Sequence, residues 1–172
     1  YSAPGKGLNF VHYALNKMRG GWAAVLIQEN AGSGIGKDFA QSILRNNTLR
    51  ASIKMSSKLF IGKAGVQTAI YVFEVKRPHE AQDVVKFIDF SEDGYARQNR
   101  KKSSQSVNLK DTDHAKERYQ EIVNLIKYGR GINDKNLNYY RDKYIEDTIA
   151  IEGSDFLANL SRIIWIVVES FV

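Results

Sequence analysis

A glycine-containing loop followed by a lysine is the first stretch of this sequence that could bind a ligand. The run Gly32-Ser33-Gly34-Ile35-Gly36-Lys37-Asp38 follows an apolar segment and precedes a helical pattern. A phosphate-binding loop requires Gly-x4-Gly-Lys-[Ser/Thr], but Ala31 stands in the place of the first glycine and Asp38 replaces the magnesium-binding hydroxyl. The spacing Gly-x-Gly-x-Gly also differs from the dinucleotide-binding pattern. We therefore expect a loop at the ligand-binding edge of a sheet, and nucleotide binding through residues 32–37 remains an alternative.

A basic, polar segment is the second candidate. Within residues 91–108, four cations stand among serine, glutamine and asparagine: Arg97, Arg100, Lys101 and Lys102. Arginine and lysine that contact a nucleic-acid backbone release counterions from its phosphates, and Tyr95 beside them could stack on a base. A plain solvated loop is the other interpretation. The net charge of +6 favours an acidic partner, with nucleic acid the leading candidate.

The composition excludes several classes of protein. The 172 residues are 43% apolar and 26% charged, which suits one soluble domain or a large piece of one. The chain has no cysteine, and its histidines lack ligand spacing, so we expect neither disulfides nor a metal site. No signal peptide and no apolar run near 18 residues is present, which predicts a cytoplasmic protein without a membrane partner. Because the chain starts at Tyr1, we expect a piece of something longer.

Hydrophobic periodicity predicts an alternation of helices and strands. The predicted helices are Leu8–Arg19, Lys37–Asn46 and Asp113–Tyr128. The predicted strands are Trp22–Ile27, Leu49–Met55, Ala69–Val75, Val84–Phe90 and a short one within Tyr144–Ile151. The order indicates half of an open α/β sheet.

Three of these strands carry more specific expectations. Trp22–Ile27 is a continuous apolar run, typical of a central parallel strand. Alternation of Leu49, Ala51, Ile53 and Met55 predicts a strand with one apolar face. Val84–Phe90 is expected to lie antiparallel to Ala69–Val75, because roughly ten connecting residues are too few for a crossover helix.

The chain is organised around the loop Lys58–Thr68 and the buried strand that follows it. Gly62 and Gly65 permit a tight approach just before that strand. Loops at the ends of buried strands are where α/β proteins place their ligands. Phe60, just ahead of the glycines, is the best aromatic candidate for a ligand contact.

The order of several segments resembles the adenine-specific DNA N6-methyltransferases. The segments are Gly7-Leu8-Asn9-Phe10-Val11, then Gly20-Gly21-Trp22-Ala23-Ala24-Val25-Leu26-Ile27, then Leu59-Phe60 through Gly65-Val66-Gln67-Thr68-Ala69-Ile70-Tyr71-Val72-Phe73. The resemblance is greatest to the modification subunits of type I restriction-modification systems and covers roughly Tyr1 to Ile151. It also includes Lys86–Lys102 and the helix from Asp113.

The resemblance implies a fold and an activity. The fold class would be α/β, the C-terminal half of a Rossmann-like S-adenosylmethionine-dependent methyltransferase sheet, mainly parallel with an antiparallel strand pair at one edge. The parent enzyme would transfer a methyl group from S-adenosylmethionine to a flipped adenine in DNA. The cofactor-binding turn and most of the catalytic Asn-Pro-Pro-aromatic tetrapeptide would lie upstream. This chain alone would then be inactive.

The resemblance also assigns roles to individual residues. Tyr1 takes the place of the catalytic aromatic that stacks on the target base. The wall of the target-base pocket would comprise Phe60, Gly65, Val66, Thr68, Glu29 and Asn30. The DNA-backbone contacts would be Arg97, Arg100, Lys101 and Lys102. Partners would be DNA and the specificity and restriction subunits.

The resemblance weakens toward the end of the chain. Residues 1–128 are expected to be a partial catalytic domain and residues 129–172 a C-terminal extension, truncated or frameshifted. The apolar tail 154–172 is expected to promote self-association. A non-catalytic DNA-binding module of a restriction-modification complex remains the alternative function.

Overall fold

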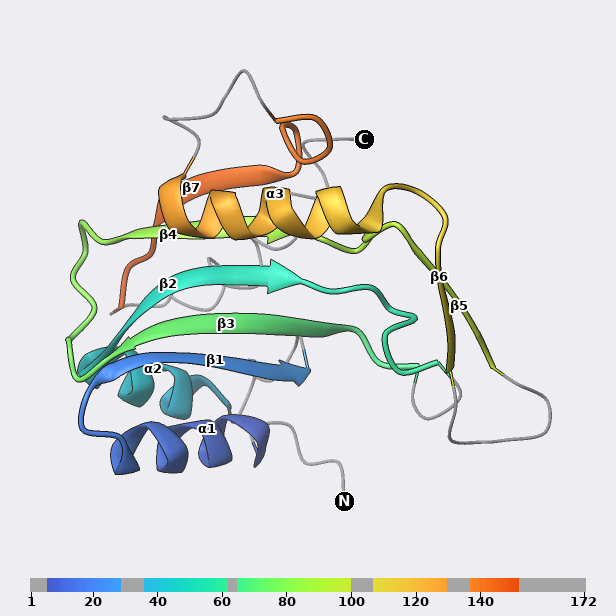
Figure 1. The fold of residues 1–172 in the computed structure, drawn as a ribbon. Helices are drawn as coiled ribbons and strands as arrows, with labels where there is room; N and C mark the ends of the chain where they lie inside the picture. Colours follow the sequence, from blue (N-terminus) through green and yellow to red (C-terminus); the bar gives the residue numbers. More distant parts are fainter. Residues whose placement is uncertain (1–5, 29–35, 62–64, 100–106, 130–136, 152–172) are drawn as a thin grey trace.

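The computed structural model describes residues 6–28, 36–61, 65–99, 107–129 and 137–151 (Figure 1). The elements in chain order are α1 (Lys6–Lys17), β1 (Gly21–Gln28), α2 (Gly36–Asn46), β2 (Asn47–Lys54), β3 (Thr68–Val75), β4 (Val84–Asp89), β5 (Tyr95–Asn99), β6 (Val107–Asp111), α3 (Ala115–Tyr128) and β7 (Tyr144–Thr148). Each predicted helix and strand is present. The β5–β6 pair is new, because its polar sequence gave no strand signal.

Five strands form the main sheet in the order β1-β3-β2-β4-β7. β3 lies antiparallel between β1 and β2, and β7 lies antiparallel to β4. Among the strands that the structure describes, only β2 and β4 pair in parallel. The described sheet is thus mixed and mainly antiparallel, so the expectation of a mainly parallel sheet is not confirmed. β5 and β6 form a separate antiparallel ribbon that projects from one end of the main sheet (Figure 1).

The placement predicted for one strand is wrong, and a second strand has the predicted direction but another neighbour. β1 pairs antiparallel with β3 and is the first strand of the described sheet, with Trp22 and Leu26 exposed, rather than a central parallel strand. β4 runs antiparallel to β3, as predicted, but β2 lies between them, so β4 pairs with β2 in parallel and not with β3. A short link between β3 and β4 is compatible with the parallel β2–β4 pair. The antiparallel strand β3 already returns the chain to the end of the sheet where β2 begins, so no crossover helix is needed.

The main sheet separates two apolar cores. α1 and α2 cover one face, where their side chains pack with β3 residues such as Tyr71 and Phe73. α3 covers part of the other face, where Ile122 and Leu125 are its main buried apolar residues. The register of β2 against β3 shifts between Leu49 and Ala51. The expected single apolar face of β2 is therefore wrong, because Leu49 packs in the first core and Ala51, Ile53 and Met55 pack in the second.

The segment after α3 belongs to the same packed unit. β7 extends the sheet beyond β4, and the side chains of Tyr140, Tyr144 and Ile149 are almost fully buried. Among the described residues of the range 6–151, the packing is therefore continuous across the boundary expected after Tyr128. The tail 154–172 lies outside the described residues. Within the described ranges, no helix is long and apolar enough to cross a membrane.

Candidate functional site

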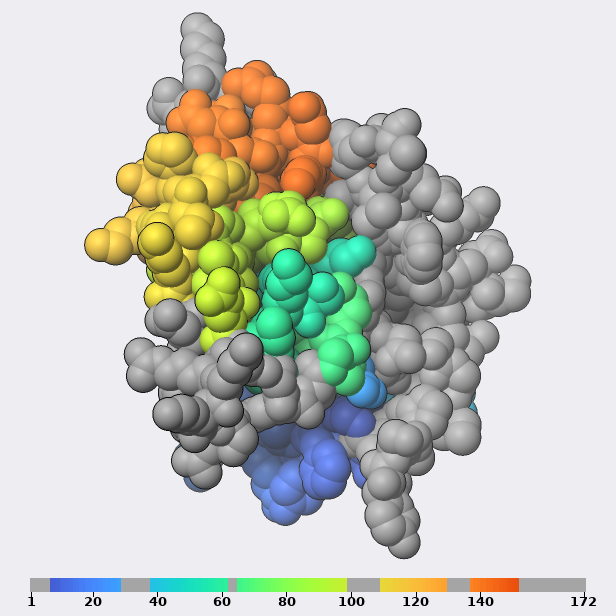
Figure 2. Space-filling model, turned by 90° about the vertical axis from the view of Figure 1, so that its right-hand side faces the viewer, coloured from blue at the N-terminus to red at the C-terminus, as the bar shows by residue number. Residues whose placement is uncertain are grey.

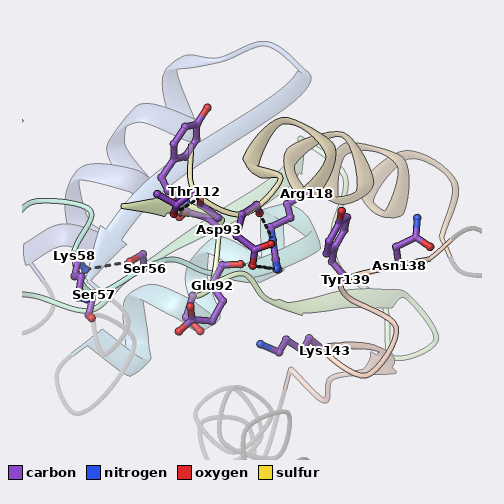
Figure 3. Close-up of a pocket in the computed structure, with 14 residues that line it drawn as sticks. Ser56, Ser57, Lys58, Glu92, Asp93, Thr112, Arg118, Asn138, Tyr139 and Lys143 are labelled. Carbon is purple, nitrogen blue, oxygen red and sulfur yellow. Dashed lines mark hydrogen bonds and ion pairs between the residues drawn. The ribbon is translucent and has the colours of Figure 1, made fainter. Parts of the chain in front are cut away.

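A polar crevice lies where the parallel strands β2 and β4 end. Its volume is about 570 Å³. The turns after both strands line it, together with the start of α3 and a segment before β7 (Figure 3). Figure 2 faces this end of the molecule and shows these segments gathered on one face. Ligands of α/β proteins bind outside the carboxyl ends of neighbouring parallel strands, so the location is that of a binding site.

The lining residues come from four places in the sequence. Ser56, Ser57 and Lys58 follow β2, and residues 91–95 (Ser91, Glu92, Asp93, Gly94 and Tyr95) lie between β4 and β5. Thr112, Asp113 and Arg118 come from the start of α3, and Asn138, Tyr139 and Lys143 precede β7. The four groups are distant in sequence, so tertiary structure alone brings them together.

Asp93 holds one wall of the crevice in place. Its side chain is 2% exposed and pairs with Arg97, whose Nη1 lies 3.0 Å from Asp93 Oδ1. The Tyr95 N–H donates to the same oxygen over 3.1 Å, and the Tyr119 hydroxyl donates to Oδ2 over 3.3 Å. Burial by itself would raise the pKa of Asp93, but these donors, Arg97 foremost, bring it below its ordinary value. Asp93 is therefore an ionised structural group rather than a general acid.

Arg118 lines the crevice close to Asp93 and contacts two tyrosines (Figure 3). Its Nε and Nη2 donate to the carbonyl oxygen and the carboxylate of Asp113 over 2.8 and 2.5 Å. The guanidinium lies 4.4 Å from the centre of the Tyr139 ring, a cation–π contact. Burial raises the pKa of Tyr140 to about 12, and its hydroxyl donates to the Glu92 carbonyl over 2.6 Å. Tyr140 is thus neutral and structural at physiological pH.

Two lysines of the crevice keep their charges available. Lys58 and Lys143 line it from different segments (Figure 3), and neither pairs with a carboxylate in the part of the chain that the structure describes. Both main acids of the walls, by contrast, are matched by an arginine: Asp93 by Arg97 and Asp113 by Arg118. The remaining carboxylate is the exposed Glu92. An anionic ligand therefore meets two uncommitted cations.

The residues expected to form the target-base pocket are only partly described. Phe60 is 38% exposed in the turn after β2, and Gly65 is exposed. Val66 is half-buried, and Thr68 is buried at the start of β3. None of the four lines the crevice, although Ser56–Lys58 belong to the same turn as Phe60. Tyr1, Glu29 and Asn30 lie outside the described residues, as does most of the 32–37 loop.

The expected DNA-backbone contacts divide into two groups. Arg100, Lys101 and Lys102 lie outside the described residues, between β5 and β6. Arg97 is in β5, but its side chain is 5% exposed and committed to Asp93. A buried guanidinium with its own carboxylate positions the ribbon and does not reach a phosphate.

Sequence reasoning did not identify Arg118, Asn138, Tyr139 and Lys143 as site residues. The polar residues directly after β2 and β4 carry a usable signal, since turns at the ends of adjacent parallel strands share one edge. That signal required the β2–β4 pairing, which was predicted incorrectly. Nothing in the sequence indicates that residues 138–143 fold back to the same edge. No cluster of three or more metal-binding side chains is present in the described ranges.

The fold is a mixed α/β sheet, and solved structures share this fold. Neither a family model nor a curated protein matches the sequence. A modification subunit assigned to a type I restriction enzyme of Vibrio vulnificus YJ016 aligns with 83% of this chain at a TM-score of 0.54 and 13% identity. A chain from a type I restriction-modification system aligns with 82% at a TM-score of 0.53 and 15% identity.

The structural neighbours are thus components of type I restriction-modification systems, and this chain has the fold of a part of them. It spans 27% and 28% of the length of the two neighbouring chains. At 13% and 15% identity, the likeness concerns the fold.

Proposed function

We propose that this chain is part of a DNA adenine N6-methyltransferase, the modification subunit of a type I restriction-modification system. The observation that supports the proposal most strongly is the fold shared with two components of such systems over more than four fifths of the chain. The order of the segments from Gly7 to Phe73 points to the same family. The parent enzyme transfers a methyl group from S-adenosylmethionine to adenine in DNA, in the cytoplasm and with specificity and restriction subunits as partners.

In this proposal the chain contributes the target side of the catalytic domain. Residues 1–128 derive from that domain, and residues 129–172 are an extension that supplies β7 to its sheet. Tyr1 stacks on the flipped adenine, and Phe60, Gly65, Val66, Thr68, Glu29 and Asn30 wall the base pocket. Arg100, Lys101 and Lys102 contact the DNA backbone, while Arg97 holds the ribbon that carries them.

The crevice does not fit the cofactor. A binding turn for S-adenosylmethionine needs glycine backbone that is open to the ligand. At Gly94, the glycine of the crevice, the space where a Cβ would stand is filled by the backbone of Asp113 and Ala115. The proposal therefore places the cofactor turn in a part of the protein upstream of Tyr1, and no step of the reaction is assigned to the crevice.

The test compares this chain with the product of its gene extended upstream. We expect the extended protein to transfer labelled methyl groups from S-adenosylmethionine to DNA, with N6-methyladenine as the product, and the 172-residue chain to transfer none. Robust transfer by the chain alone would refute its inactivity. An extended protein that binds DNA without methylating it would favour the non-catalytic DNA-binding module instead.

A further inference from the structure

The side chains that line the crevice are of the types that contact nucleic-acid backbones. Phosphate and sugar oxygens in protein–DNA complexes are bound mainly by arginine, lysine, serine, threonine, asparagine and tyrosine, together with backbone N–H groups. Every lining residue belongs to these types except Glu92, Asp93, Gly94 and Asp113. The crevice is therefore hydrophilic on all sides, which suits a sugar–phosphate chain better than an apolar ligand.

The charges of the crevice favour an anion. Asp93 and Asp113 are each matched by an arginine, so neither presents an uncompensated negative charge. Lys58 and Lys143 remain, opposed only by Glu92 among the lining residues that the structure describes. The two lysines come from the turn after β2 and from the segment before β7, and they lie apart in the crevice (Figure 3).

The walls of the crevice are held rigid before any ligand arrives. The N–H groups of Thr112 and Asp113 both donate to the Gly94 carbonyl over 3.1 Å, which closes the base of the ribbon. The Glu121 carboxylate accepts the N–H groups of Tyr139 and Tyr140, each over 3.1 Å, which fixes the segment before β7. A preformed site loses less conformational entropy when it binds.

The β5–β6 ribbon rises directly from the crevice. Tyr95, the first residue of β5, lines the crevice, as does Thr112, which follows the last residue of β6. The ribbon then projects beyond the end of the sheet (Figure 1), and Lys110 in β6 is exposed. A two-stranded ribbon has the dimensions to enter a major groove, so a duplex lying over the crevice would also meet this element.

We propose that this crevice is the seat of one strand of the DNA backbone, with Lys58 and Lys143 as its phosphate contacts. The inference rests on the proposed function for the identity of the nucleic acid. It assigns the contact to residues outside the expected target-base pocket and different from Arg100, Lys101 and Lys102. The crevice holds the duplex in register while the target base is handled elsewhere.

The experiment measures binding of the full chain to a fluorescein-labelled DNA duplex of arbitrary sequence by anisotropy, at a series of salt concentrations. The test variant is Lys58→Ala with Lys143→Ala. We expect weaker binding and a salt slope lower by about 1 for each lysine that contacts a phosphate. A neutral dextran in place of DNA should not bind to either protein.

The matched control is Lys17→Ala with Lys127→Ala. This variant has the same net charge, but both lysines are exposed and stand in the last turns of α1 and α3, away from the crevice. We expect its salt slope to equal that of the unmodified chain. Equal losses in the two variants would show a general charge effect and overturn the proposal, as would an unchanged slope in the test variant. Circular dichroism of both variants excludes unfolding.

The result of this DNA-binding experiment is independent of the result of the methylation test. If the crevice variant loses phosphate contacts but the extended protein methylates nothing, the proposed function fails while the DNA seat stands. If the extended protein methylates adenine and the crevice variant binds as before, the DNA seat fails while the proposed function stands.

Discussion

Two buried aspartates among the described residues, Asp83 and Asp93, are each paired with an arginine. Asp83 is 7% exposed and accepts hydrogen bonds from Arg77 and from the Glu80 N–H, over 2.8 and 2.7 Å. The Arg77 guanidinium lowers the pKa of Asp83 to about 2. The pairing stabilises the link that carries the chain from β3 to β4. Lys58 and Lys143 have no carboxylate partner among the described residues, and the proposed DNA seat rests on this difference.

His79 in the same link should make stability depend on pH. Its Nδ1 accepts the Leu49 N–H over 3.3 Å, and the ring is 3% exposed. Burial lowers the pKa of His79; the nearby Asp83 opposes this shift, while Arg50 and Arg77 add to it. A group with a lowered folded pKa binds its proton more readily when unfolded. Stability is therefore complete above the ordinary value of 6.5 and is lost as the pH falls below it, by up to about 1.4 kcal/mol per pH unit.

Urea unfolding at pH 7.5 and pH 5.5 checks this prediction. His79→Asn keeps an acceptor for the Leu49 N–H but does not titrate, so its stability should change less between the two pH values than that of the unmodified chain. Asp83 remains ionised over this range because its pKa is about 2. Equal pH dependence in both proteins would contradict the assignment.

At the scale of elements, the junction between the β5–β6 ribbon and α3 depends on one backbone conformation. Gly94 has φ +82°, and a Cβ there would lie 2.4 Å from the Asp113 carbonyl oxygen and 2.9 Å from the Ala115 Cα. The close approach lets the Gly94 carbonyl accept two N–H groups from the end of the ribbon. The ribbon is thus fixed to the start of α3 rather than attached by a free linker.

Gly94→Ala should therefore destabilise the protein by about 2 kcal/mol or more, because the positive φ and the backbone clash add. Gly65→Ala is the matched control: its φ is not positive, and a Cβ there meets nothing within 4 Å. Its effect should be near zero or slightly stabilising. Thermal unfolding of the two variants makes the comparison, and similar melting temperatures would refute the tight junction.

At the scale of the whole molecule, the two outer strands of the main sheet come from the two ends of the described chain. β1 comes from the N-terminal part and β7 from the segment after α3, with β2, β3 and β4 between them. The core on the α3 side includes Tyr140 and Tyr144, which are 0% and 1% exposed. Folding of the sheet therefore requires residues on both sides of the boundary expected after Tyr128.

Truncation tests this requirement directly. A chain ending at Tyr128 loses β7 and the buried Tyr140, Tyr144 and Ile149, and we expect it not to fold. Removal of a large buried side chain costs about 3 kcal/mol, so the combined loss exceeds the stability of a typical domain. A chain ending at Ile151 should retain a cooperative urea transition. A stable 1–128 product would instead support two separable units.

The sequence by itself determined the type of most elements and the family resemblance. Helical and strand periods depend on local side-chain order, and this is why Leu8–Arg19 and Asp113–Tyr128 were predicted within a few residues. Strand neighbours depend on long-range pairing, which local patterns do not encode. β1 was therefore predicted as a strand but given the wrong position and direction in the sheet, and β4 was given the right direction but the wrong neighbour.

For the candidate site, too, the sequence shows which residue types are present and the tertiary structure shows which of them lie together. Arg97 was recognised as a cation from the sequence, but only its burial against Asp93 shows that it is structural. The polar turns after β2 and β4 can be read from sequence, but only the parallel pairing of these strands places them on one edge. Lys143 and Tyr139 join them through the fold of residues 137–143 onto α3. Composition thus determined which charged residues are available. The tertiary structure decided which of them pair with one another and which remain free to face a ligand. The reason is that ion pairing depends on distances in space, which the order of residues in the chain does not specify.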